Sequence, residues 1–78
     1  MAIRLSDLQP GVEATVVTIQ GGHGLRRRLF SQGISEGRTL RKVSSLAWGG
    51  PVVVRIDRAQ VALGRGMANR VLVEPRNG

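Results

Sequence analysis

One stretch of helical character, residues 22–34, divides a chain that is otherwise broken into short β-like runs. Within this stretch, Leu25 and Leu29 fall on one face of a helical wheel, and Phe30 lies at the edge of that face. Gly33 can adopt the left-handed conformation that ends a helix, which brings the apolar residue after it back toward Leu29. The sequence therefore predicts one short helix that docks on a core and ends at Gly33.

Short runs rich in β-branched residues predict five strands around this helix, at residues 12–20, 38–44, 52–56, 61–63 and 70–74. Residues 12–20 carry apolar side chains on both sides, which predicts a strand covered on both faces at its far end. One helical turn is expected at residues 5–9, and at most one more at residues 64–69. Five strands with one core favour a small closed barrel, because closure removes exposed strand edges. We expect one mainly β domain over residues 1–78, with one or two short helices and a frayed tail at residues 75–78.

The charge of the chain is lopsided. Twelve Lys and Arg against five Asp and Glu give a net charge of +7, and Lys42 is the only lysine. Six of the twelve basic residues lie between Arg26 and Lys42. Arginine suits planar recognition of carboxylate or phosphate, so an acidic partner is indicated, whether protein, nucleic acid or anionic lipid. Charge that serves solubility alone is the alternative interpretation.

The side-chain inventory argues against catalysis and against a metal centre built by this chain alone. There is no cysteine, His23 is the only histidine, and the five acidic residues are dispersed along the chain. His23 stays open as a shared metal ligand between copies of the chain. No apolar run is long enough to span a bilayer, and the first residues have no apolar signal core. We therefore expect a cytoplasmic protein that is not an enzyme, inserts in no membrane and has no cofactor.

The residues expected to contact a partner lie on the predicted helix and on a glycine-flanked loop. Arg27 and Arg28 fall away from the apolar face of the helix. Trp48 would be a natural interface anchor if exposed, and it packs on the barrel otherwise. The predicted partner-binding set is His23, Leu25, Arg26, Arg27, Arg28 and Trp48. Nucleic acid is disfavoured, because stacking on single strands needs more aromatic side chains than the two present.

Several short motifs follow one another along nearly the whole chain in a characteristic order and spacing. They are Leu5-Ser6-Asp7-Leu8 with Pro10-Gly11, Gly24 to Leu29 with Gly33-Ile34, Gly37, Pro51 to Arg55, Val61 to Arg65, Ala68, and Val71 to Glu74. With these motifs the chain resembles the ferrous iron transport protein A (FeoA) family.

That resemblance implies an SH3-like β-barrel with an inserted helix, in a small accessory protein of bacterial ferrous iron uptake. It also implies a partner, the membrane permease FeoB, which carries a cytosolic GTPase domain. The same fold occurs as the C-terminal domain of metal-dependent repressors, so transition-metal binding is associated with the family. Two alternatives to the docking function stay open, a basic nucleic-acid-binding module and a metal-sensing domain. An oligomer is also possible, since an open sheet edge could pair with another copy.

Overall fold

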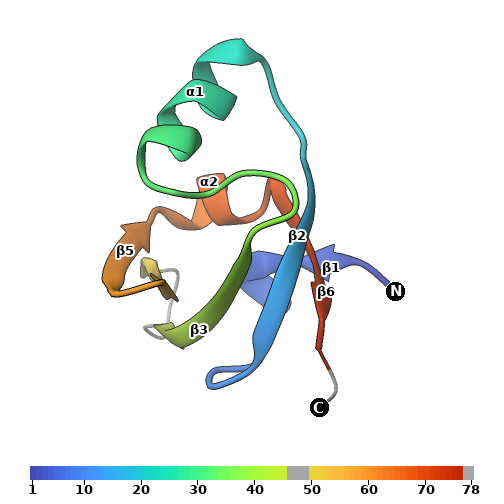
Figure 1. Ribbon diagram of the computed structural model, residues 1–78, viewed down its shortest axis with the longest axis vertical. Coiled ribbons are helices and arrows are strands. Elements are labelled where there is room, and N and C mark those ends of the chain that lie inside the picture. The colour runs from blue at the N-terminus through green and yellow to red at the C-terminus, as the bar shows by residue number, and fades with distance from the viewer. Residues whose placement is uncertain (46–49, 77–78) are drawn as a thin grey trace.

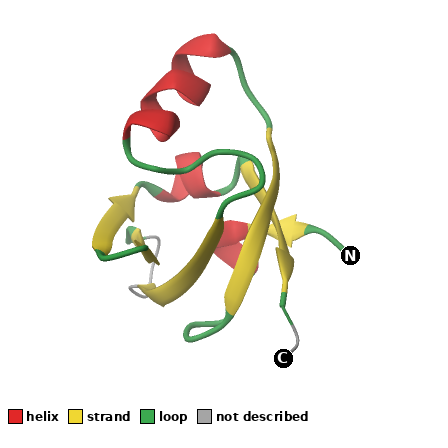
Figure 2. Ribbon diagram, viewed as in Figure 1, coloured by secondary structure: helices red, strands yellow, loops and turns green. Residues whose placement is uncertain are grey.

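In the computed structural model, six antiparallel strands form one curved sheet within the part of the chain that the structure describes (Figures 1 and 2). The described part comprises residues 1–45 and 50–76, with Ser45 described by its backbone only. The strands are β1 Ile3–Arg4, β2 Glu13–Ile19, β3 Thr39–Ser45, β4 Val52–Ile56, β5 Ala59–Leu63 and β6 Val71–Pro75, in the spatial order β1-β6-β2-β3-β4-β5. The helical elements are η1 Leu5–Asp7, a 3₁₀ turn, and two α-helices, α1 His23–Ser31 and α2 Arg65–Ala68.

The mainly β class with short helices is confirmed, but the predicted number of five strands is wrong. The added strand β1 spans only Ile3–Arg4, and it forms because these residues pair with β6 at Val73 and Leu72. A two-residue strand has no periodicity of its own, so only its long-range partner reveals it. The strand predicted at residues 61–63 begins earlier, since a two-residue turn joins Ile56 directly to Ala59.

The apolar residues on both sides of β2 result from a β-bulge, whereas the sequence suggested that both faces of the strand are covered. Ala14 and Val16 are buried, and the pairing of β2 with β6 then shifts register between Val16 and Thr18. The extra residue, Val17, is 48% exposed, and Ile19 returns to the core. A β-bulge changes which side chains face inward in this way. The prediction that both faces are covered is therefore wrong, because a single inner face continues through the bulge.

The tail predicted to fray is tied to β2 in its described part. Pro75 pairs with Ala14 at the end of β6, and the Arg76 N–H donates to the Glu13 carbonyl at 2.8 Å. Residues 77–78 lie outside the described residues.

Lys42 is a buried cation at the inner side of β3. It is 1% exposed, and it shares the inward face of the strand with the buried Leu40. Its ammonium donates to the carbonyl oxygens of Leu5 at 3.3 Å, Ser6 at 3.0 Å and Leu8 at 2.5 Å. Burial lowers the pKa of Lys42, and the nearby charge of Arg65 lowers it further. A buried ammonium is tolerated where its donors are used, so these three bonds fasten the η1 turn to β3.

We predict that Lys42→Met destabilises the fold by about 2–3 kcal/mol, because the carbonyls at the end of η1 lose their charged donor while the volume of the side chain is kept. Urea unfolding followed by circular dichroism would measure the change. Arg55→Met, on the exposed side of β4, is the matched control and should stay within about 0.5 kcal/mol of wild type. Equal stabilities of the two variants would contradict this role of Lys42.

Helix α1 ends as the sequence predicted. Gly33 has φ +89°, its N–H donates to the Phe30 carbonyl at 2.9 Å, and the Ile34 N–H donates to the Leu29 carbonyl at 2.9 Å. These are the two hydrogen bonds of a Schellman motif. Leu29 and Ile34 are both fully buried in the core cluster. The motif therefore fixes where α1 stops and turns the chain toward β3.

Two glycine-to-alanine substitutions in this region should change the free energy of unfolding in opposite directions. Gly33→Ala should destabilise by about 1–2 kcal/mol, because an L-residue is strained at positive φ. The added Cβ would lie 3.7 Å from Ile56, an ordinary contact, so the backbone alone causes the loss. Gly24→Ala, within α1 and with open space around its Cβ, should stabilise by about 0.5–1 kcal/mol. Thermal unfolding of both variants measures this, and destabilisation at both positions would contradict it.

Candidate interaction groove beside helix α1

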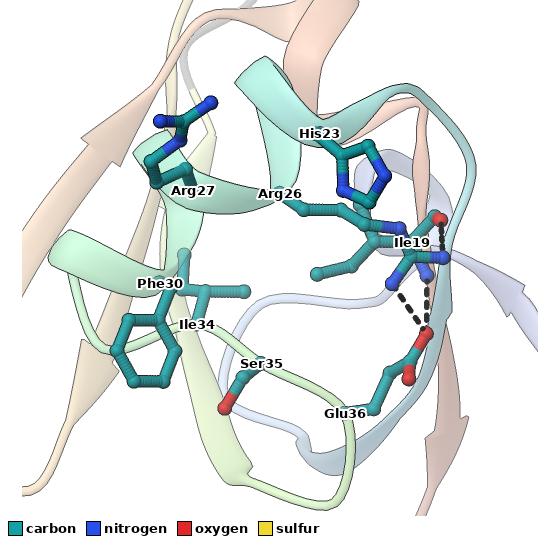
Figure 3. A pocket seen from close by; sticks show the side chains of 8 residues that line it. All are labelled: Ile19, His23, Arg26, Arg27, Phe30, Ile34, Ser35 and Glu36. Atoms are coloured by element: carbon teal, nitrogen blue, oxygen red, sulfur yellow. Dashed lines mark hydrogen bonds and ion pairs between the residues drawn. The ribbon is translucent and has the colours of Figure 1, made fainter.

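An open groove of about 440 Å³ lies between α1 and the segments that enter and leave it (Figure 3). One wall is α1, and the other is formed by the end of β2 and the loop that leads from α1 to β3. The lining residues are Ile19, His23, Arg26, Arg27, Phe30, Ile34, Ser35 and Glu36. Ile19 and Ile34 belong to the buried core, so apolar atoms form the base of the groove.

Arg26 joins the three segments that form the groove. Its guanidinium donates to a Glu36 carboxylate oxygen at 3.0 Å and to the Ile19 carbonyl at 2.7 Å (Figure 3). Arg26 belongs to α1, Ile19 ends β2, and Glu36 lies in the loop after α1. The planar guanidinium presents several donors in fixed directions, which suits it to bridging two acceptors. Arg26 thus fixes α1 in relation to the sheet.

Glu36 receives donors from β2 as well as from the helix. Its Oε2 accepts from the Thr18 hydroxyl at 3.2 Å and from the Ile19 N–H at 3.4 Å. The Arg26 hydrogen bond, followed by the bond from the Ile19 N–H, holds the pKa of Glu36 below its usual value of 4.5. Glu36 is therefore ionised at neutral pH, and its charge is balanced within the groove by Arg26.

We predict that the difference in melting temperature between wild type and Glu36→Gln is largest above pH 4.5 and shrinks as the pH falls below that value. A carboxylate whose pKa is lowered by folding stabilises the folded state above its unfolded-state pKa, and this contribution is lost on protonation. Thermal unfolding across this range measures it. The pH dependence should weaken in an Arg26→Gln background, because this variant lacks the hydrogen bond that contributes most to the lowered pKa of Glu36. A difference that does not vary with pH would contradict the assignment.

The outer part of α1 carries an exposed aromatic ring and two arginines without an acidic partner among the described residues. Phe30 is 69% exposed, and Arg27 and Arg28 are exposed beside it in sequence. Every acidic side chain of the chain already lies in an ion pair. The pairs are Arg4 with Asp7, Arg41 and Arg76 with Glu13, Arg26 with Glu36, Arg38 with Asp57, and the Met1 amine with Glu74. No ion pair among the described residues therefore balances the positive charge of Arg27 and Arg28.

The structure brings three members of the predicted partner-binding set together in the groove, namely His23, Arg26 and Arg27. Arg28 is exposed on α1 but does not line the groove. Leu25 is half-buried and packs against the core. Its side chain also lies close to Gly21, because a Cβ added at Gly21 would lie 2.5 Å from the Leu25 Cδ2. Trp48 lies outside the described residues.

Two further groove residues, Phe30 and Glu36, were not in the predicted set. Phe30 had a usable signal, because it lies at the edge of the apolar face of the predicted helix and is one of two aromatic residues. Glu36 had none, since it falls in a turn whose distance from Arg26 is decided by the fold.

The donor set does not fit a resident transition metal. Among the described residues, no three His, Cys, Asp or Glu side chains form a group that could hold a metal ion. In the groove, His23 is accompanied by a single carboxylate, Glu36, whose Oε2 is engaged by Arg26. A structural transition-metal site needs about four such ligands.

The described helices also include none with the length and apolar character needed to cross a bilayer.

Comparison with known proteins gives consistent matches. A family model described as the FeoA domain matches residues 3–75. The putative Fe(2+) transport protein A of Methanocaldococcus jannaschii is 34% identical over 70 residues, which cover 90% of this chain and 83% of that protein. The Fe(2+) transport protein A/Fe(2+) transporter FeoB fusion protein of Porphyromonas gingivalis is 33% identical over 92% of this chain, which corresponds to 8% of the fusion protein.

Solved structures share the fold. A crystal structure of an iron uptake regulatory protein (FeoA) superposes with a TM-score of 0.88 at 36% identity, covering 97% of this chain and 99% of that chain. A manganese-dependent transcriptional repressor superposes with a TM-score of 0.87 at 30% identity, covering 96% of this chain and 42% of that chain.

Proposed function

The chain belongs to the FeoA family of ferrous iron transport accessory proteins and has its SH3-like fold, and from that premise we propose that it is a docking and regulatory module for a FeoB-like permease. In this proposal the chain performs no catalysis, and ferrous iron is the cargo of its partner. The fusion protein of Porphyromonas gingivalis supports an association of the two, because an A module and a FeoB transporter share one polypeptide there. The proposed meeting place is the cytoplasm, where the family's permease carries its GTPase domain.

The observation that carries the proposal is the unneutralised charge on α1. Arg27 and Arg28 are exposed without an ion pair among the described residues, and the exposed Phe30 lines the groove together with Arg27. Opposite charge on a partner raises the association rate and selects against wrong partners, while a buried aromatic ring supplies affinity. An acidic surface on the cytosolic part of the permease would meet both features.

Two other functions remain as alternatives, each with one observation in its favour. The net charge of +7 favours nucleic acid, although Phe30 alone offers an exposed aromatic ring within the described residues. A gel shift at near-physiological salt would reveal such binding by its steep loss at higher salt. The likeness to a manganese-dependent repressor favours a metal-sensing domain, whereas the donor set on the described residues speaks against it. Calorimetry with manganous ion tests that alternative.

We predict that the double variant Arg27→Glu/Arg28→Glu binds the permease at least about 10-fold more weakly and supports less ferrous iron uptake, because the steering charge is reversed. Arg26 is kept, since a glutamate there would face Glu36 and loosen α1. Capture of the detergent-solubilised permease by the tagged chain, at two salt concentrations, measures binding, and uptake of labelled ferrous iron by cells measures function.

The matched control is Arg55→Glu/Arg58→Glu, which changes the net charge equally at exposed positions away from the groove. Permease binding by this control should stay within about 3-fold of wild type. If both double variants lose binding equally, the effect is one of net charge. If neither loses binding or uptake, α1 is not the docking surface.

A further inference from the structure

We propose that the groove beside α1 receives a partner segment in which one large apolar side chain is flanked by carboxylates. This inference rests on the docking function proposed above, and it specifies the chemistry that the partner must present. It follows from three features of the groove, which are its apolar base, its excess of cationic side chains and its fixed shape.

The apolar part of the groove matches a single large side chain. The ring of Phe30, 69% exposed, stands on the α1 wall, and the buried residues Ile19 and Ile34 supply the base. The volume of about 440 Å³ lies at the lower end of the range for ligand pockets, about 300–1,000 Å³. When a second apolar side chain covers the exposed Phe30 ring, apolar surface is removed from water, which favours binding. The groove therefore favours a leucine-sized or phenylalanine-sized anchor.

The charged part of the groove favours carboxylates on either side of that anchor. Glu36 is the only acidic side chain in the lining, and the Arg26 guanidinium already balances its charge. Arg27 lines the same groove with no ion pair in the described part of the chain, and Arg28 follows on α1. An acidic segment would find a guanidinium in place, whereas a basic segment would be repelled.

The groove is fixed before any partner arrives. Arg26 ties α1 to the end of β2 and to the loop after the helix, and the Schellman motif at Gly33 fixes the other end of α1. Binding then orders few side chains, which lowers the entropy cost of a short segment. Single-stranded nucleic acid fits less well, because it stacks on several aromatic rings, and among the described residues that line the groove only Phe30 is aromatic.

The test is a titration of the ¹⁵N-labelled full chain, followed by NMR, with a short synthetic peptide in which a phenylalanine is flanked by glutamates. We expect the amide signals of Phe30, Ser35 and Glu36 to move. A peptide with lysines in place of the glutamates, and one with glycine in place of the phenylalanine, should each bind at least about 10-fold more weakly. Equal binding of the lysine peptide, or a stronger shift of the same amides by oligouridine, would overturn the inference.

The variant Phe30→Ala should bind the glutamate peptide about 30-fold more weakly, the factor typical of a central interface residue. Phe30 is largely exposed, so its removal leaves the core intact. Val17→Ala is the matched control, because Val17 is 48% exposed and does not line the groove. We expect this control to bind within about 2-fold of wild type. Equal losses in the two variants would count against the groove.

The peptide and the permease separate this inference from the docking function. If the wild-type chain captures the permease and Arg27→Glu/Arg28→Glu does not, while the glutamate peptide leaves the groove amides unmoved, docking stands and the groove inference fails. If the peptide occupies the groove but the wild-type chain captures no permease, the groove chemistry stands and the proposed partner is wrong.

Discussion

The buried ammonium of Lys42 is the constraint on which the arrangement of the N-terminal segment depends. A domain of 78 residues has a small core, and here one of the inward positions of β3 holds a cation. Its three hydrogen bonds end on the carbonyl oxygens of Leu5, Ser6 and Leu8, and the Leu5 carbonyl also accepts from the Leu8 N–H at the end of η1. The same contact places Leu5 and Leu8 in the core and leaves β1 in position to pair with β6. One side chain thus joins the chain's first segment to the middle of the sheet.

Arg26 has an equivalent role for the candidate groove, although it is only half-buried. It connects α1, the end of β2 and the loop before β3, so the groove walls keep their spacing through its two hydrogen bonds. This use of Arg26 separates it from Arg27 and Arg28, its neighbours in an unbroken run of arginines. The run therefore divides into one residue that holds the helix in place and two that present charge outward. Their proposed function in docking follows from this division.

The pairing of charges within the chain leaves part of its net positive charge on α1. Each of the five acidic side chains is paired with a cation of the chain, and among the described residues none of these pairs involves Arg27 or Arg28. Exposed pairs of this kind contribute little to stability, but they distribute the net charge over the surface. The positive charge on α1 lies on the same helix as the exposed ring of Phe30. This surface can therefore attract an acidic partner from a distance and make an apolar contact with it once bound. The FeoA family membership and the relative fused to a FeoB transporter support the proposal that such a permease is the partner.

The sequence by itself determined the mainly β class, the single α1 with its end at Gly33, and most strand positions, because β-branched runs, glycine at positive φ and helical periodicity are local signals. It also identified the arginines of α1 as candidates for partner contact. Only the tertiary structure decided that β1 exists, that Val17 forms a bulge, that Lys42 points inward and that Arg26 meets Glu36. Each of these four depends on contacts between different elements of the fold, and a local pattern carries no information about which carbonyl or carboxylate of another element will lie within hydrogen-bond distance. The division is physical, since backbone preference acts over a few residues whereas the burial of a charge depends on the whole fold.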